Sequence, residues 1–324
     1  MRTSNLMFVF LVALLAITSG LATAVPIYDL EVVSNPNCYA FAQSINDSGA
    51  IAAYGYPNGS SVHGLIYGRD GVRDLGPNTW AADVNTGGVP CGQNYMIAAY
   101  WKNRRSVLID KKGDYSVAYS INTIGDIACS VAYRPYLFDG KLHRLSENYG
   151  AAMVVNDDGL VGGNIYSPTN GHSVPVLWEK QKKGYVQLNL PLPVGAVEGY
   201  VYALDEQGNA VGYTVNASYA VRATVWTKGG SRRNPVYSAM YLPAFEANSF
   251  AMGVNAKGQV VGAGEQSACI WQGGQVYDLN YRVVDLKGCR LFAAMSINDS
   301  GQIACRAYYY ATGYTVVVRL TPRQ

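Results

Sequence analysis

Short apolar runs separated by polar turns return seven times along the chain. Each unit begins with a small apolar run, continues with Ile-Asn or a close variant, and reaches a second apolar run after a Gly. Residues 44–49 and 296–301 are the first and last copies, and both read Ser-Ile-Asn-Asp-Ser-Gly. Asn and Asp can bond their own backbone, and Gly accepts a positive φ, so this phrase predicts a tight turn between two antiparallel strands.

Each unit has room for two further strands. The third ends in an aromatic residue, as in Leu65-Ile66-Tyr67 or Ile270-Trp271, and the fourth is short, as in Tyr277-Asp278-Leu279. The turn residues that mark the units are 34 to 50 positions apart: Asn46, Asn85, Asn122, Asn156, Asp205, Asn255 and Asn298. A repeat of this length buries its apolar face only against its neighbours. The pattern predicts an all-β fold, a seven-bladed β-propeller of four-stranded antiparallel blades.

Residue size suggests how the blades are packed. The second strands are made of small residues, as in 50–53 and 302–305, and small residues let another backbone approach closely. We therefore expect the second strands to lie in the crowded region near the central axis. Trp178, Trp226 and Trp271 end third strands and are expected to pack between blades. The least regular unit is the second, around Asn85, and its strand boundaries are uncertain.

The two ends of the chain complement each other. The last unit has three strands and no fourth, whereas residues 27–30, Ile-Tyr-Asp-Leu, match the fourth-strand phrase of residues 277–279. We predict that this N-terminal strand completes the last blade. Such a closure removes an open sheet edge and makes the ring one cooperative unit.

The first 24 residues read as a secretory signal peptide. Arg2 precedes an apolar stretch over 6–17, and Ala22-Thr23-Ala24 is a small-x-small cleavage site. The apolar stretch is shorter than the about 20 residues of a membrane span. An uncleaved N-terminal anchor is the alternative. We expect residues 25–324 to form a single domain that is secreted or extracytoplasmic, in a periplasm or at a cell surface.

Six cysteines, all after residue 24, allow disulfides in an exported protein. None has C-x-x-C spacing. Cys38 and Cys289 precede the first and last turn by similar distances, so a bridge between them is predicted; buried free thiols are the alternative.

The repeats resemble the extracellular HAF repeat, a family named for a His-Ala-Phe step. The first unit carries the resemblance best. Residues 45–51 match the turn of the family's repeat, residues 63–67 match its His-Ala-Phe step, and Asp74-Leu75-Gly76 match its closing Asp-Leu-Gly. The namesake His is present only at His63. The resemblance spans residues 25–324 and implies a propeller-like, exported repeat protein; it implies no reaction.

Signatures of cofactor or metal chemistry are not found. The net charge is +3, which gives no reason to expect nucleic-acid binding. The three histidines do not stand in metal-binding spacings, and no G-x-S-x-G or phosphate-binding loop occurs. Acids in the turns are explained by turn chemistry. We expect no cofactor and no metal.

Tyrosine is unusually frequent, with 26 residues, and many tyrosines fall in loops between second and third strands. These loops are expected to share one rim. Tyr has a rigid ring with a polar tip, which suits recognition surfaces, although filling between blades is the alternative. Candidate rim residues are Tyr56, His63, Tyr219, Tyr309 and Tyr314. Two basic loops, around Arg104 and Lys228, are expected to be solvated, with an anionic glycan as the alternative partner.

Four Asn-x-Ser sequons occur, at Asn46, Asn58, Asn216 and Asn298. Asn58 and Asn216 lie in longer loops and are the better N-glycosylation acceptors, if the source organism glycosylates exported proteins.

The sequence therefore predicts an exported, non-enzymatic binding or interaction scaffold, a monomer whose partner is a glycan or an extracellular protein held on a loop rim. The alternative is a carbohydrate-active enzyme, a glycoside hydrolase or lyase, with acids from several blades around the central axis. Two carboxylates about 5–10 Å apart in a central pocket would favour the enzyme.

Overall fold

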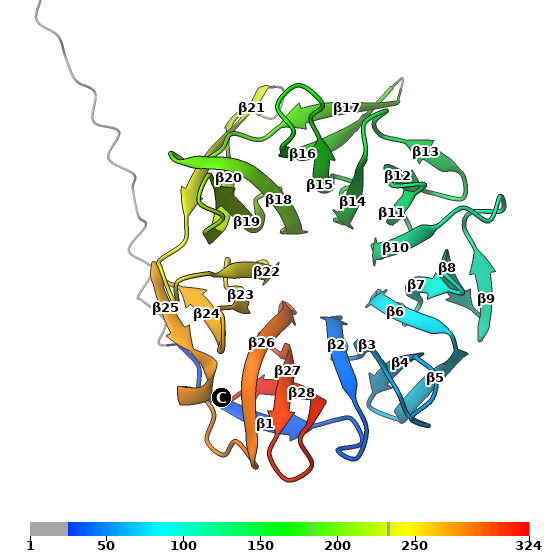
Figure 1. The fold of residues 1–324 in the computed structure, drawn as a ribbon, viewed down its shortest axis with the longest axis vertical. Coiled ribbons are helices and arrows are strands. Elements are labelled where there is room, and N and C mark those ends of the chain that lie inside the picture. The colour runs from blue at the N-terminus through cyan, green and yellow to red at the C-terminus, as the bar shows by residue number, and fades with distance from the viewer. Residues whose placement is uncertain (1–24, 183, 232–233, 324) are drawn as a thin grey trace, which may run out of the picture.

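The computed structural model describes residues 25–324 except 183, 232–233 and 324, and it contains seven four-stranded antiparallel sheets arranged in a ring (Figure 1). The predicted seven-bladed β-propeller is therefore confirmed. The predicted signal peptide, residues 1–24, lies outside the described residues. No helix among the described residues has the length and apolar character to cross a membrane.

The blades follow one another along the chain. Blades 1 and 2 are β2 (Ala40–Ile45), β3 (Ile51–Gly55), β4 (His63–Gly68), β5 (Gly71–Pro77), and β6 (Thr79–Val84), β7 (Pro90–Asn94), β8 (Ile97–Lys102), β9 (Arg105–Leu108). Blades 3 and 4 are β10 (Ser116–Ile121), β11 (Ile127–Val131), β12 (Arg134–Phe138), β13 (Leu142–Arg144), and β14 (Gly150–Val155), β15 (Val161–Tyr166), β16 (Ser173–Gln181), β17 (Gly184–Asn189). Blade 5 is β18 (Ala196–Leu204), β19 (Ala210–Asn216), β20 (Val221–Ser231) and β21 (Asn234–Tyr241). Blade 6 is β22 (Phe250–Val254), β23 (Val260–Ala263), β24 (Ala268–Gln272) and β25 (Gln275–Asp278), followed by the 3-10 turn η1 (Leu279–Tyr281). Blade 7 is β26 (Cys289–Ile297), β27 (Ile303–Tyr309), β28 (Tyr314–Pro322) and the N-terminal β1 (Tyr28–Val32).

The N-terminal strand completes the last blade, as predicted. β1 pairs antiparallel with β28, in the register Tyr28 to Pro322 through Val32 to Val318. Tyr28 is fully buried and Leu30 is 4% exposed in the core of blade 7. The first and last strands of the described residues are thus held in one sheet.

The first strand of each blade, and not the second, lies innermost (Figure 1). This corrects the expectation from the small second strands. The second-strand residues are small because the neighbouring first strand of the same blade lies very close to them. A Cβ added to Gly92 on β7 would lie 1.8 Å from the Trp80 carbonyl oxygen on β6. Gly212 on β19 meets the Tyr200 carbonyl in the same way, at 1.9 Å. The second strand is small because the first strand presses a carbonyl group into it.

The apolar core lies between adjacent blades. Trp178 and Trp226, at equivalent points of the third strands of blades 4 and 5, are fully buried, and Trp271 is 3% exposed. The indole Nε1 of Trp226 donates to the Pro191 carbonyl oxygen at 2.7 Å, in the loop that leads into blade 5. These tryptophans are packing residues, as the sequence predicted.

The repeated Asn residues have a second role that the sequence pattern did not reveal. Within its own turn each accepts a backbone N–H four residues ahead, as Asn85 Oδ1 does from Val89 N at 2.9 Å. Its Nδ2 also donates to the backbone carbonyl of the equivalent residue in the next blade. Six such links run around the axis: 46 to 85, 85 to 122, 122 to 156, 156 to 205, 255 to 298 and 298 to 46. Asp205 has no side-chain N–H, and the link from blade 5 to blade 6 is the one that is missing from this series.

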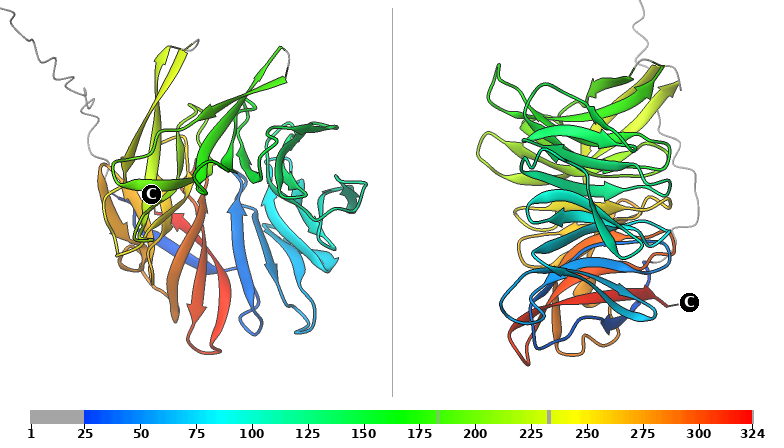
Figure 2. Two further views of the ribbon diagram at one scale, coloured as in Figure 1. Left: turned by 45° about the horizontal axis from the view of Figure 1, so that its top comes forward. Right: turned by 90° about the vertical axis from the view of Figure 1, so that its right-hand side faces the viewer.

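Antiparallel order gives the ring two distinct faces. The Asn turns between first and second strands, together with the third-to-fourth strand turns, lie on one side, which we call the turn face. The second-to-third strand loops and the starts of the first strands lie on the other side, which we call the tyrosine face. On the turn face, the hairpins β16–β17 and β20–β21 are long and project from the ring (Figure 2).

All six cysteines are free thiols, so the predicted bridge between Cys38 and Cys289 is wrong. Cys289 begins β26 and is buried in the core of blade 7, whereas Cys38 lies in the loop before β2, near the Asn35 carbonyl oxygen. Similar distances from the turn did not place the two thiols together, because Cys38 lies outside β2 and β26 carries a second bulge between Leu291 and Ala293.

Candidate functional site

Every first strand carries a bulge three residues before its Asn or Asp turn residue. In blade 1, Ala42 pairs with Ala53 and Ser44 with Ala52, which leaves Gln43 without a partner in the ladder. The same shift occurs in the other six blades. Bulges re-aim side chains and recur next to functional sites.

The seven bulged residues all line one cavity on the central axis. It has a volume of about 550 Å³. The bulged residues are Gln43, Ala82, Tyr119, Met153, Tyr202, Met252 and Met295. Aromatic rings and flexible thioethers dominate this wall, which is typical of a small-molecule site.

Two ionisable side chains of opposite charge also line the axial cavity, Asp83 on β6 and Arg306 on β27. Asp83 accepts N–H groups from Val84 and Ile121, at 2.8 and 3.0 Å. Because it is buried, its pKa is raised; nearby hydroxyls and these N–H groups oppose that rise. Its bond to Ile121 joins blade 2 to blade 3, which is a structural role.

A second, smaller cavity of about 230 Å³ lies on the axis at the turn face. It is lined by the Asn residues of the turns and by the acids that follow them. Asp157 accepts the Thr123 N–H at 2.8 Å, and Asp299 accepts the Ala256 N–H at 2.8 Å. These carboxylates tie neighbouring turns together, consistent with the turn chemistry expected from the sequence.

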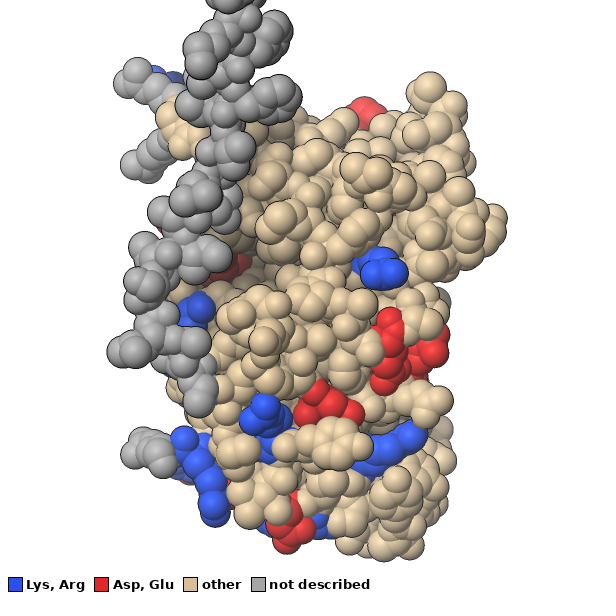
Figure 3. Space-filling model, turned by 90° about the vertical axis from the view of Figure 1, so that its left-hand side faces the viewer, with Lys and Arg blue, Asp and Glu red and all other residues tan. Residues whose placement is uncertain are grey.

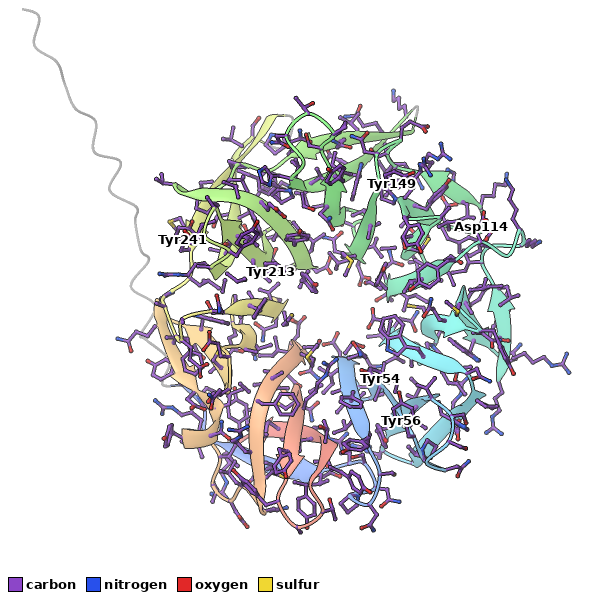
Figure 4. All side chains as sticks on the ribbon, viewed as in Figure 1. Tyr54, Tyr56, Asp114, Tyr149, Tyr213 and Tyr241 are labelled. Atoms are coloured by element: carbon purple, nitrogen blue, oxygen red, sulfur yellow. The ribbon has the colours of Figure 1, made fainter. Side chains whose placement is uncertain are left out.

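The opposite face gathers exposed tyrosines. They lie in the second-to-third strand loops and at the starts of the first strands: Tyr39, Tyr56, Tyr95, Tyr115, Tyr133, Tyr149, Tyr166, Tyr219, Tyr308 and Tyr310. Backbone bonds link the two sets, as in Tyr56 N to Tyr39 O at 2.9 Å and Tyr166 N to Tyr149 O at 2.7 Å. In Figure 4, Tyr54 and Tyr213 lie closer to the axis than Tyr149 and Tyr241.

Three of these exposed tyrosines have left-handed backbone conformations. The φ angles are 49° at Tyr95, 60° at Tyr133 and 63° at Tyr219. Their side chains are 66%, 62% and 85% exposed, so burial does not offset the strain. A left-handed residue other than Gly costs about 1–2 kcal/mol, and such strain tends to occur at functional sites.

Aromatic contacts join the tyrosine face to the wall of the axial cavity. Tyr314 meets Tyr39 edge-on at 4.5 Å between ring centroids, Phe41 stacks on Tyr54 at 4.9 Å, and Tyr54 meets Trp80 at 6.2 Å. Blades 5 and 6 carry a second cluster, in which Tyr213 contacts Tyr200, Tyr202 and Phe250.

The candidate rim residues differ in their surroundings. Tyr56 and Tyr219 are exposed on the tyrosine face, at 37% and 85%. Tyr309 and Tyr314 lie on the same face but are half-buried, Tyr309 against the core of blade 7 and Tyr314 against Tyr39.

His63 does not present a ring nitrogen to a ligand. It is 6% exposed, its Nδ1 lies 2.9 Å from both Asp74 carboxylate oxygens, and its Nε2 lies 3.0 Å from Ser61 Oγ. The pair joins β4 to β5, because Asp74 lies on β5. This side chain therefore stabilises blade 1 instead of contributing to the rim.

The four sequon asparagines differ in their surroundings. The side chains of Asn46 and Asn298 are buried and bonded in the ring of Asn links. Asn58 is exposed, and Asn216 is half-buried, with its Oδ1 accepting N–H groups from Ser218 and Ala220 at 2.9 Å.

Charged side chains do not gather on one face as the exposed tyrosines do. The basic loop of residues 102–105 is exposed in the β8–β9 hairpin at the turn side, and Arg232 and Arg233 lie outside the described residues. On the side shown in Figure 3, small groups of both signs interrupt a surface made mostly of other residues. Within the described part of the chain, no three His, Cys, Asp or Glu side chains form a group that could hold a metal ion.

Comparison with known proteins adds no assignment: no protein-family model matches the chain, and no curated protein matches it.

Proposed function

We propose that this protein is an exported, HAF-like repeat protein that binds a glycan non-enzymatically on its tyrosine face. The observation that carries the proposal is the concentration of exposed tyrosines on one face of the ring. Tyrosine gives a large contact area with little side-chain entropy to lose, and its hydroxyl can hydrogen-bond to a polar ligand.

The strained hairpin tips support the same proposal. Residues 95–96 and 132–133 form two-residue turns with positive φ at both positions, although neither turn contains Gly. Asn-Gly is the favoured sequence for such turns. The chain keeps exposed aromatic residues at a conformational cost, which is expected when their side chains recognise a partner.

A glycan array probed with residues 25–324 tests the proposal. Wild type should bind a defined group of glycans, and the double variant Tyr219→Ala with Tyr310→Ala should lose the signal. Tyr281→Ala is the matched control, because Tyr281 is as exposed as Tyr219, at 85%, but belongs to η1 after β25 and not to a second-to-third strand loop. If wild type binds no glycan, the glycan proposal fails and a protein partner takes its place.

One observation favours the enzyme as a second candidate. Glu206 of blade 5 lies against Asp157 of blade 4, with the Asp157 N–H 3.2 Å from Glu206 Oε2 at the axis of the turn face. Burial, and then the charges of Asp157 and Asp158, raise the pKa of Glu206, as a general acid requires. Turnover of glycans by wild type that is abolished in Glu206→Gln would establish this alternative; no turnover would remove it.

A further inference from the structure

The axial cavity contains a cation, Arg306, that forms no ion pair among the described residues. Arg306 reaches from β27 of blade 7 toward blade 1, where its Nε donates to the Ala42 carbonyl oxygen at 2.9 Å. Its guanidinium carbon lies 5.9 Å from the centre of the Phe41 ring. Among the described residues, no carboxylate lies within ion-pair distance of it, and its two Nη groups make no hydrogen bond.

Arg306 is exceptional among equivalent positions. In each blade, the first-strand residue five positions before the turn residue pairs with one residue of the second strand. These second-strand residues are Tyr54, Gln93, Ser130, Asn164, Tyr213, Ala263 and Arg306. Only blade 7 has a charge there. Its opposite residue, Ala293, is small, which leaves the long side chain room over blade 1.

The indole ring of Trp80 lines the same wall. Trp80 Nε1 is buried and has no hydrogen-bond partner among the described residues. Trp80 belongs to blade 2 and meets Tyr54 of blade 1, whereas Arg306 approaches Phe41 of blade 1 from the other side. Trp80 therefore contributes ring surface beside Arg306, whose two Nη groups are the donors left for an acceptor-bearing ligand.

The other residues that line the cavity favour a ligand whose uncharged part is apolar or aromatic. Met153, Met252 and Met295 form a flexible apolar surface, and Tyr119 and Tyr202 add rings. Asp83, the other charged group in the cavity, already accepts two backbone N–H groups. The volume of about 550 Å³ suits a small molecule.

We propose that the axial cavity is a separate binding site for a small molecule with an apolar or aromatic body and one anionic group, in which Arg306 holds the anion and the body packs against Trp80 and the methionines. This site goes beyond the proposed glycan surface. The two differ in place and in ligand size, so either can fail without the other.

A matched pair of fluorescent probes tests the selection for charge. 8-Anilinonaphthalene-1-sulfonate carries the anion, and N-phenyl-1-naphthylamine has the same rings without it. Wild type should bind both and prefer the sulfonate. Arg306→Gln should weaken sulfonate binding about 10- to 100-fold, because a hydrogen bond to a charged group is lost, and should leave the neutral probe bound as before.

Three further variants complete the test. Arg69→Gln removes the same charge from an exposed turn of blade 1 and should change neither probe. Met252→Trp should fill the cavity and weaken both, whereas Tyr219→Ala with Tyr310→Ala should affect neither. Thermal midpoints verify that each variant is folded. The proposal is overturned if wild type binds neither probe or shows no preference, or if Arg306→Gln binds the sulfonate as wild type does or loses both probes equally.

Discussion

The two faces of the ring differ in how their polar groups are used. On the turn face, Asn side chains and acids are bonded to the backbone of the next blade, so the groups that repeat most faithfully are engaged with one another. On the tyrosine face, exposed rings occupy strained tips and vary from blade to blade. The comparison indicates that repetition marks the residues that hold the ring together, and divergence marks the residues available for recognition.

The largest effect is expected from opening the ring that both faces share. Deleting residues 25–34 removes β1, leaves blade 7 with three strands and exposes the core that Tyr28 and Leu30 fill. We expect loss of the cooperative thermal transition of the whole domain. The milder Leu30→Ala should cost about 2–5 kcal/mol in the free energy of unfolding.

Glu31→Gln is the control for this closure. It removes the ion pair with Arg319, in which the Glu31 side chain is 59% exposed, and should cost less than about 1 kcal/mol. A truncated protein that melts as wild type does would show that β1 does not close the ring.

The Asn links are the next largest expected effect. Asn85→Asp keeps the acceptor for Val89 N but replaces the donor to the Asn122 carbonyl oxygen, 3.0 Å away, with an oxygen. We expect a loss of about 1–3 kcal/mol by chemical denaturation. Thr86→Ala, which removes an exposed hydroxyl contact next to it, should be nearly neutral. Equal losses from both variants would contradict a specific role for the links.

A smaller effect of opposite sign is expected on the tyrosine face. Replacing Tyr95-Met96 with Asn-Gly gives the turn its preferred sequence, and we expect a gain of about 1 kcal/mol with reduced ligand binding. The matched control is Arg104→Gly in the β8–β9 turn, where Asn103 and Arg104 have φ of 52° and 63°. It should also stabilise, but without loss of binding. A destabilised Asn-Gly variant would mean that these tips are not strained.

The smallest net change in the free energy of unfolding at neutral pH is expected for Asp83→Asn, because relief of a buried charge offsets the loss of one of its two backbone hydrogen bonds. Because burial raises the pKa of Asp83, the folded state holds the proton more tightly than the unfolded state does. This carboxyl therefore contributes stability below its ordinary pKa near 4 that is lost as the pH rises through the folded-state pKa. The free energy of unfolding should fall less steeply with rising pH in the variant. Parallel curves for the two proteins would exclude this contribution.

Local turn chemistry explains why the sequence predicted the blades and their closure. The Ile-Asn-x-x-Gly phrase fixes a hairpin within six residues, and the match between residues 27–30 and 277–279 placed β1 correctly. The Asn links were missed because each spans 34 residues or more, and a local pattern does not show which carbonyl faces a side chain.

The axial site was missed for a different reason. Its residues sit three positions before the turn, where a bulge changes which side chains face the axis, and alternation along a strand does not reveal a bulge. Counting back three positions from each turn residue would have identified the Gln, Ala, Tyr and Met residues that line the cavity. His63 was assigned to the rim because of its loop position, but its bonds to Asp74 and Ser61 depend on strand pairing.

The most direct test measures glycan binding and the thermal midpoint on the same two variants, one from each face. The account predicts that Tyr219→Ala with Tyr310→Ala loses binding at an unchanged midpoint, and that Asn85→Asp lowers the midpoint while the folded fraction binds as wild type does. Undiminished binding by the tyrosine variant, together with impaired binding by folded Asn85→Asp, would place recognition on the turn face and contradict the account.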